Sequence, residues 1–249
     1  MTDAIVLERE GSLLTLRLNR ADKKNALTRA MYSQLGQALR EADADPEINA
    51  VLIRGSSECF TSGNDIADFL EEPPSALDSP VFAFMRSLLD CRKPVIAAVA
   101  GPAVGIGTTL LLHCDLVYVS ADARLRMPFV NLGLCPEFGS SLLLPRLLGH
   151  ARAAQLLLLG EGFSGEQAAT WGLATEALPS GELALAKARE VALRFDQLAS
   201  AAVQVSKQLM KDPDREQLRQ VVEAEAVLFI QRLRSPEAIA ALSGFMTRR

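Results

Sequence analysis

Glu137 is the residue of this chain whose surroundings most clearly indicate chemistry. It is the only glutamate between Glu72 and Glu161, and it follows a proline in an apolar, small-residue stretch at 132–141. Apolar surroundings disfavour the charged form of a carboxyl group and raise its pKa, which suits the group to exchange a proton with carbon near neutral pH. An acid can also stand at the start of a helix, where the helix dipole stabilises its charge. Two hypotheses therefore apply to Glu137, a catalytic base and a helix-start acid.

Two glycine-containing segments could bind the negative charge that such a base creates. Segment 60–65, Phe-Thr-Ser-Gly-Asn-Asp, follows an apolar strand expected at 50–54, and segment 101–107, Gly-Pro-Ala-Val-Gly-Ile-Gly, follows one expected at 94–99. Glycine lets a ligand approach the backbone, and the unpaired N–H groups of a first helical turn can bind an oxyanion. The alternative is that these glycines only make tight turns.

Strands and helices alternate in the part of the chain that must position these residues. Thr28 is expected to cap a helix that stops at Asp45-Pro46, and Pro80 is expected to begin another. Further helices are expected up to 112, at 142–148 and 151–159, and after a capping-box pattern at 164–167. The remaining expected strands, the first two forming a hairpin, lie at 5–9, 13–18, 116–119, 125–127 and 173–177. This alternation predicts an α/β core.

Two further regions have distinct patterns. From Gly181 onward the periodicity is helical, with interruptions at Asp212-Pro213 and Ser235-Pro236. The stretch 70–80 lacks apolar periodicity, so we expect an exposed loop there, which a mobile lid would fit.

Composition excludes several classes of function. The chain has 249 residues and a net charge of −4, which argues against a nucleic-acid-binding surface, and its apolar runs are too short for a membrane helix. The four cysteines form no CxxC pair and there are two histidines, so we expect neither a disulfide framework nor a metal site. The N-terminus carries no basic or arginine-rich leader. We expect a soluble, cytoplasmic protein without nucleic-acid or membrane partners.

A set of motifs in a fixed order resembles the crotonase (enoyl-CoA hydratase/isomerase) superfamily over most of the chain. In this sequence the motifs are Leu18-Asn-Arg with Asn25-Ala-Leu, 60–66, 101–107, Cys114-Asp115, and Leu132-Gly with Pro136-Glu137. The resemblance implies a spiral of repeated ββα turns with a C-terminal helical trimerisation region. We therefore expect a core at 1–195 and an oligomerisation region at 196–249, in a homotrimer or a dimer of trimers.

The resemblance also implies an acyl-CoA thioester as ligand, with coenzyme A as part of the substrate and no separate cofactor. The two oxyanion-binding N–H groups would belong to Asn64 and Ile106; isoleucine replaces a more usual glycine without removing the donor. Coenzyme A would lie near Arg20, Lys24, Ala26, Leu27, Ser62, Asp65 and Ile66. Lys24 is the candidate for a phosphate contact, although a solvated loop lysine fits equally. Phe229 or Arg248 of a neighbouring subunit could also approach the ligand.

The distribution of acids separates the reactions of the superfamily. Two-glutamate hydratases carry acids where this chain has Thr109 and Phe129, neither of which can move a proton. With its acid at Glu137, the chain resembles instead the peroxisomal-type Δ3,Δ2-enoyl-CoA isomerases, in which one glutamate shuttles a proton. We expect 3-enoyl-CoA to become 2-enoyl-CoA; the alternatives are an enoyl-CoA hydratase and a non-catalytic acyl-CoA-binding module.

Other polar and aromatic residues have simpler structural interpretations. Asp65 and Asp68 are expected to act as caps, in the same way that Asn64 could use its side chain. His113 is expected to be a core or surface histidine, and Tyr118 and Trp171 are expected to be packing residues.

Overall fold

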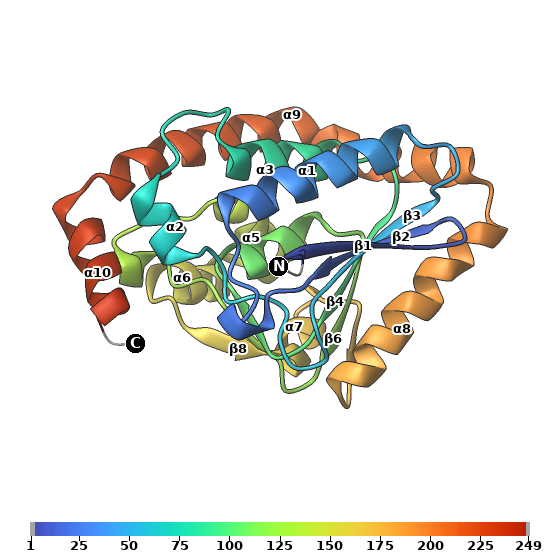
Figure 1. The fold of residues 1–249 in the computed structure, drawn as a ribbon, viewed down its shortest axis with the longest axis horizontal. Coiled ribbons are helices and arrows are strands. Elements are labelled where there is room, and N and C mark those ends of the chain that lie inside the picture. The colour runs from blue at the N-terminus through green and yellow to red at the C-terminus, as the bar shows by residue number, and fades with distance from the viewer. Residues whose placement is uncertain (1–2, 248–249) are drawn as a thin grey trace.

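The computed structural model describes residues 3–247, and a six-stranded sheet forms their centre (Figure 1). The strand order is β1-β2-β3-β4-β6-β9; β1 and β2 are antiparallel, and every other neighbouring pair is parallel. The bounds are β1 Ile5–Glu10, β2 Leu13–Leu18, β3 Ala50–Arg54, β4 Val95–Val99, β6 Leu116–Ser120 and β9 Glu176–Leu178. The expected hairpin and α/β alternation are confirmed.

A second sheet has three short strands in the order β5-β7-β8. They are β5 Pro102–Val104, β7 Arg124–Arg126 and β8 Gly162–Ser164. Sequence periodicity predicted only β7, because β5 and β8 are three residues long and contain proline or glycine. As a result, the glycine segment at 101–107 is not a simple turn but includes a strand of the second sheet.

The two faces of the large sheet pack against different helices. In β3, Val51 and Ile53 belong to the main core, whereas Leu52 belongs to a smaller core beneath α8 (Gly181–Leu193). This alternation follows from the two-residue period of a strand. On the main-core side, α1 (Arg29–Ala44) packs against α3 (Pro80–Asp90) (Figure 1).

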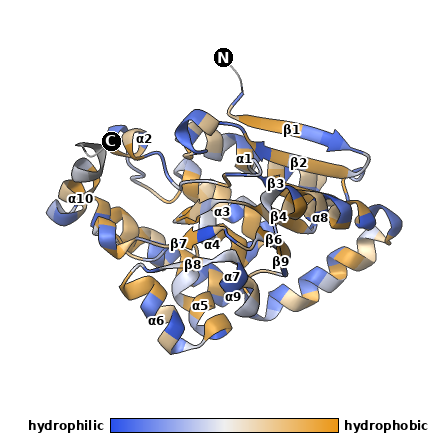
Figure 2. Cartoon of the chain, turned by 90° about the horizontal axis from the view of Figure 1, so that it is seen from below, coloured by the Kyte–Doolittle hydropathy of each residue, from blue (hydrophilic) through white to orange (hydrophobic). Residues whose placement is uncertain are grey.

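The remaining helices surround these layers and carry both hydrophilic and hydrophobic residues (Figure 2). The α-helices are α2 Ile66–Glu71, α4 Ile106–Thr109, α5 Ser140–Leu148, α6 His150–Leu158, α7 Gly165–Thr170, α9 Ser200–Leu233 and α10 Pro236–Thr247. Short 3-10 helices lie at Ala21–Lys23, Leu110–His113, Val130–Leu132 and Arg194–Gln197. Among the described residues, no helix is long and apolar enough to span a membrane.

The expected helix starts are confirmed. Thr28 accepts a hydrogen bond from the Met31 N–H at 3.3 Å, Pro80 is the first residue of α3, and Ser164 with Gln167 forms a capping box. Each device satisfies or removes a backbone N–H that lacks a partner within the helix.

The interruption expected at Asp212-Pro213 is wrong, because α9 continues through Pro213. A proline inside a helix costs about 3 kcal/mol through a lost hydrogen bond and a steric clash. Ion pairs hold the helix on both sides of it: Lys211 with Asp115 at 3.0 Å, and Arg219 with Asp90 at 2.5 Å. These long-range contacts keep α9 continuous, and the interruption expected at Ser235-Pro236 is confirmed as the junction to α10.

Segment 72–79 is a loop, as expected, and it is exposed apart from Pro74 and the partly buried Ser79. The first two residues of the expected loop, Leu70 and Glu71, belong to α2 instead. The role of the loop as a lid stays a prediction, as does the division of the chain at 195/196.

Candidate active site

The two glycine segments lie side by side in the structure. The Thr61 N–H donates to the Pro102 carbonyl oxygen and the Val104 N–H donates to the Thr61 carbonyl oxygen, both at 3.0 Å. Gly63 has φ of +88°, and a Cβ atom there would lie 2.7 Å from the Val104 oxygen. Glycine at 63 therefore permits a close approach that brings the residue after it, Asn64, beside the start of α4.

The N–H of Asn64 is left unpaired by a small bridge around it. Leu27 donates to the Gly63 oxygen at 2.8 Å, and Asp65 donates to the Leu27 oxygen at 2.9 Å. The bridge uses the backbone groups on either side of Asn64. Within the described part of the chain its own N–H has no acceptor, and it remains available to a ligand.

The N–H of Ile106 is available for a different reason. Ile106 is the first residue of α4 and follows Gly105, whose φ is +57°. A first-turn N–H has no partner inside its own helix, and none of the described residues provides one. The structure thus places two unpaired backbone donors on the adjoining segments.

Glu137 is linked to the same helix through Thr109. Its side chain is 4% exposed, and the Thr109 hydroxyl donates a hydrogen bond to its Oε1. Thr109 lies three residues after Ile106, which is one turn of α4. Thr109 therefore holds the Glu137 carboxyl one helical turn from a candidate oxyanion donor.

Burial raises the pKa of Glu137 to about 8. The hydrogen bond from Thr109 acts in the opposite direction, and the negative charge of Glu225 raises the pKa further. A carboxyl group with this pKa can both accept and return a proton near neutral pH.

Tyr32, on the buried face of α1, contacts the side chain of Asn64. Its hydroxyl donates to the Asn64 side-chain oxygen. Burial raises the pKa of Tyr32, and the nearby charges of Glu137 and Asp68 raise it further. The hydroxyl is therefore a fixed donor that orients the Asn64 side chain. Sequence reasoning did not identify Tyr32, because its partner is 32 residues away.

Glu225 of α9 is a second buried acid that sequence reasoning missed. It is 7% exposed and accepts hydrogen bonds from the N–H groups of Gly139 and Ser141 and from the Ser141 hydroxyl. Burial raises its pKa, while these hydrogen bonds act against the shift. A signal was available, because Glu225 interrupts the apolar helix face formed by Val222, Ala226 and Phe229.

These contacts contradict the hypothesis that Glu137 is a helix-start acid. The carboxylate that binds the first N–H groups of α5 comes from Glu225, whereas the Glu137 carboxyl binds Thr109. The charge at the helix start is thus supplied from a distant helix.

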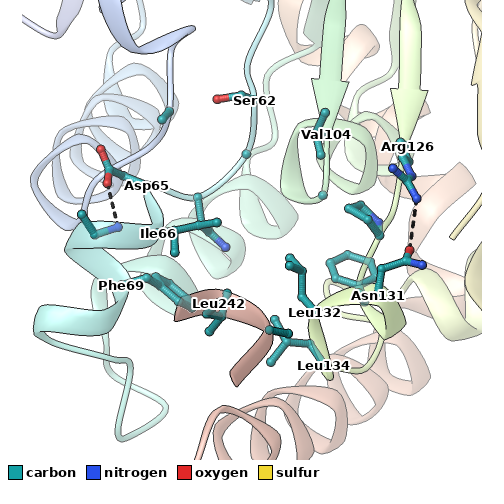
Figure 3. A pocket seen from close by; sticks show the side chains of 18 of the residues that line it. Ser62, Asp65, Ile66, Phe69, Val104, Arg126, Asn131, Leu132, Leu134 and Leu242 are labelled. Carbon is teal, nitrogen blue, oxygen red and sulfur yellow. Dashed lines mark hydrogen bonds between the residues drawn. The ribbon is translucent and has the colours of Figure 1, made fainter. Parts of the chain in front are cut away.

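A cavity of about 1080 Å³ opens beside the two donors. One wall contains residues of 62–69, and the other contains Val104 and residues of 126–134, with Leu242 of α10 also facing the cavity (Figure 3). The expected coenzyme A residues that line it are Arg20, Lys24, Ala26, Ser62, Asp65 and Ile66.

Three predicted site residues are not part of the described lining. They are Leu27, Ile106 and Glu137. The side chain of Ile106 is buried, so its proposed contribution is the backbone N–H alone. Glu137 is bound to Thr109, one helical turn from Ile106, and it is not among the described residues that line the cavity.

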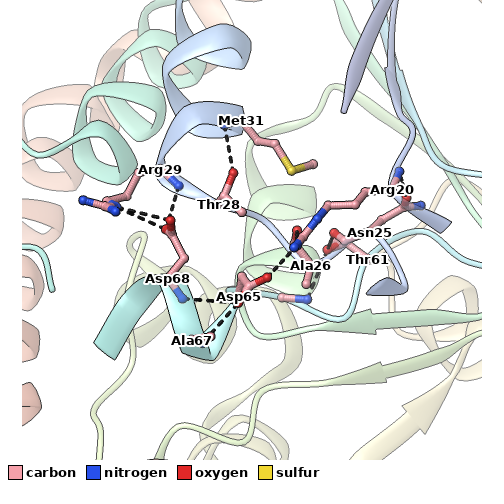
Figure 4. Close-up of polar contacts among 11 residues, drawn as sticks. Arg20, Asn25, Ala26, Thr28, Arg29, Met31, Thr61, Asp65, Ala67 and Asp68 are labelled. Carbon is pink, nitrogen blue, oxygen red and sulfur yellow. Dashed lines mark hydrogen bonds and ion pairs between the residues drawn. The ribbon is translucent and has the colours of Figure 1, made fainter. Parts of the chain in front are cut away.

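Arg20 and Asp65 are engaged with each other near the cavity (Figure 4). Arg20 donates to Asp65 at 2.5 Å and to the Ala26 carbonyl oxygen at 2.9 Å. Asp65 also accepts from the N–H groups of Ala67 and Asp68, which makes it the cap expected for α2. Burial alone would raise the pKa of Asp65, but these donors lower it. Arg20 thus has a local structural partner, whereas Lys24 makes no ion pair with any described residue.

The remaining sequence predictions can be placed directly. Phe229 lines the cavity of its own chain and packs edge-on against Phe69, with ring centroids 6.3 Å apart. Arg248 lies outside the described residues. His113 is buried, its Nε2 is 2.7 Å from the Phe138 oxygen, and burial lowers its pKa to about 3, so it is a neutral core residue.

Trp171 packs against Phe163 and Arg152, as expected of a packing residue. Tyr118 packs in the smaller core beneath α8. No cluster of His, Cys, Asp and Glu suited to a metal ion occurs among the described residues.

This chain is similar to known proteins over nearly its whole length. The Enoyl-CoA hydratase/isomerase family matches residues 8–249. The solved structure of Pseudomonas aeruginosa OdaA is 66% identical, with a TM-score of 0.97, and the match covers 98% of this chain and 99% of OdaA.

Curated relatives include both isomerases and hydratases. Enoyl-CoA delta isomerase 2 of Rattus norvegicus is 34% identical over 98% of this chain, but the chain spans only 64% of that relative's length. A probable enoyl-CoA hydratase, echA8, of Mycobacterium tuberculosis is 30% identical over 99% of this chain and 96% of its own length. The similarity confirms the expected fold without separating the two reactions. The chain belongs to the enoyl-CoA hydratase/isomerase family, within the crotonase superfamily.

Proposed function

We propose that this chain is an isomerase that converts 3-enoyl-CoA into 2-enoyl-CoA, with Glu137 as the proton shuttle. One observation carries the proposal: a buried carboxyl group with a raised pKa is held by Thr109, one helical turn from the free N–H of Ile106. The similarity to enoyl-CoA delta isomerases agrees with it.

In the proposed reaction, Glu137 removes a proton from C2 of the substrate. The electron pair moves into the thioester, and the N–H groups of Asn64 and Ile106 bind the dienolate oxygen. Glu137 then returns the same proton to C4, so the product is an isomer and no other reactant is consumed. Loss of one donor from such an oxyanion site costs about 2.7–4 kcal/mol of transition-state stabilisation.

The position of Glu137 adds a requirement to this mechanism. Because the carboxyl is not part of the described cavity lining, the acyl group must displace atoms of the wall near Asn64 to reach it. The coenzyme A portion would extend past Ser62 and Asp65 towards Lys24, whose ammonium group is suited to a phosphate.

We also propose a homotrimer or a dimer of trimers. Support comes from apolar side chains that α9 leaves exposed, including Leu209 at 72% and Met210 at 74%, because exposed apolar patches are typical of interaction surfaces. The absence of a separate cofactor and the cytoplasmic location stay predictions.

The second candidate is an enoyl-CoA hydratase, and the 30% identity to echA8 favours it. Against it, Thr109 and Phe129 occupy the positions expected for the two hydratase acids. A non-catalytic acyl-CoA-binding module would not need a buried Glu137 beside two free donors.

One assay separates these functions. The purified protein is given 3-hexenoyl-CoA and, separately, 2-hexenoyl-CoA, and the products are identified by chromatography. Formation of 2-hexenoyl-CoA from the first substrate is expected. Formation of 3-hydroxyhexanoyl-CoA from the second without isomerisation of the first would establish the hydratase, and binding without turnover of either would establish the binding module.

A further inference from the structure

Arg126 belongs to the cavity wall but has no role in the proposed proton transfer. It is the last residue of β7 and pairs in register with Val104 of β5, and both residues line the cavity (Figure 3). Its carbonyl oxygen accepts the Gly105 N–H at 2.8 Å. The arginine is thus anchored next to the residue that precedes the Ile106 donor.

Two neutral acceptors hold the guanidinium group. Arg126 Nε donates to the Gly160 carbonyl oxygen at 2.6 Å, and Nη2 donates to the Asn131 side-chain oxygen at 3.3 Å. Gly160 has φ of +62°, and a Cβ atom there would lie 2.0 Å from Asn131 Oδ1. Only glycine at 160 leaves room for Asn131 in this position, so Gly160 and Asn131 together orient Arg126.

The positive charge of Arg126 is not compensated within the described part of the chain. Arg126 makes no ion pair there, and its Nη1 has no hydrogen-bond acceptor there. Among the described lining residues the one acid is Asp65, which lies on the opposite wall and is paired with Arg20 (Figure 3). A guanidinium with free N–H groups is suited to the oxygens of a carboxylate or phosphate.

We infer that Arg126 binds an anionic group of the thioester ligand. This inference rests on the proposed acyl-CoA ligand. Two parts of such a ligand have the required chemistry: a phosphate of coenzyme A and a carboxylate at the far end of a dicarboxylic acyl group. In either case Arg126 determines which thioesters bind well, and Asn131 and Gly160 are its positioning residues.

Calorimetric titration with unreactive, saturated ligands tests the inference without depending on turnover. The ligands are hexanoyl-CoA, hexanoyl-pantetheine, which lacks phosphates, and adipoyl-CoA, which adds a terminal carboxylate. R126Q is expected to weaken hexanoyl-CoA or adipoyl-CoA binding about 10-fold, as for the loss of one charged hydrogen bond.

The pattern of losses identifies the anion. Weaker binding of both coenzyme A ligands with unchanged hexanoyl-pantetheine binding assigns a phosphate. A loss confined to adipoyl-CoA assigns the acyl carboxylate. Equal affinities of R126Q and the unaltered protein for all three ligands would overturn the inference, as would equal losses for all three.

Two further variants keep the result interpretable. R124Q changes the other arginine of β7, which is exposed and outside the described lining, and it should leave every affinity unchanged. N131D places a carboxylate beside Arg126 and should weaken the same ligands as R126Q while leaving the arginine present. If the affinities follow this pattern but 3-hexenoyl-CoA is not isomerised, the proposed reaction fails and the anion site stands.

Discussion

Asp65 and Glu137 are two acids beside the candidate oxyanion donors, and their surroundings affect them in opposite ways. Asp65 follows Asn64 and accepts hydrogen bonds from Arg20 and from two backbone N–H groups, which lower its pKa. Among the described residues, only Thr109 donates a hydrogen bond to the Glu137 carboxyl, and burial raises the pKa of Glu137 to about 8. Donors stabilise the charged form of an acid, and desolvation without enough donors destabilises it.

This difference distinguishes an acid with a structural role, Asp65, from an acid suited to proton transfer, Glu137. Asp65 stays in its charged form because its pKa is lowered, and its hydrogen bonds hold the segment that carries Asn64 in place. Glu137 can change its charge near neutral pH, because its surroundings do not favour the ionised form. Four predictions test the contrast.

The largest effect is expected for E137Q. The amide retains an acceptor for Thr109 but cannot take a proton, so isomerisation should fall by about 10²–10⁴-fold. Hexanoyl-CoA affinity, measured by titration, should change little. Isomerase activity at the unaltered level in E137Q would remove Glu137 from the mechanism.

The same variant should become more stable than the unaltered protein at alkaline pH. The pKa of Glu137 is raised from an ordinary value of 4.5 to about 8 in the folded protein, so folding favours the protonated form. The unaltered protein therefore loses stability as the pH rises from about 4.5 to 8, and E137Q does not.

We expect E137Q to gain about 4 kcal/mol relative to the unaltered protein between pH 5 and pH 9, on the order of 8–16 °C in melting temperature. Thermal unfolding at the two pH values measures the gain. A constant difference between the two proteins would contradict the raised pKa.

D65A should have the opposite effect on stability. It removes the cap of α2 and the partner of Arg20, and we expect a loss of about 1–2 kcal/mol at neutral pH. Urea unfolding measures this loss. D78A, in the exposed 72–79 loop, is the matched control and should stay within about 0.5 kcal/mol of the unaltered protein.

The smallest effects are opposite shifts of the pH dependence of kcat. Activity should rise with pH as Glu137 ionises. T109V removes the hydrogen bond that lowers the pKa of Glu137, so the rise should move to higher pH. E225Q removes a charge that raises this pKa, so the rise should move to lower pH. Shifts in the same direction would show that the two neighbours do not act through the charge of Glu137.

Regular patterns of the sequence predicted most of the fold. The buried face of α1 repeats with the helical period, Thr28 and Pro80 mark helix starts, and β3, β4 and β6 of the large sheet are mainly apolar runs of five residues. The short strands β5 and β8 were missed because they depend on neighbouring strands for their hydrogen bonds. Pro213 was predicted to interrupt the helix because the ion pairs of α9 with Asp115 and Asp90 join residues far apart in the sequence, and a local pattern does not reveal them.

The sequence by itself determined the family motifs, the isolation of Glu137 and the glycines that allow Asn64 to approach α4, because these are local properties of residue type and spacing. Only the tertiary structure decided which groups surround the acid. Thr109, Tyr32 and Glu225 come from three different helices, and Arg126 of β7 donates to Asn131 of the following 3-10 helix and to Gly160, which precedes β8. Desolvation and hydrogen bonding depend on these long-range neighbours, and they set the pKa of Glu137 and leave the charge of Arg126 facing the cavity.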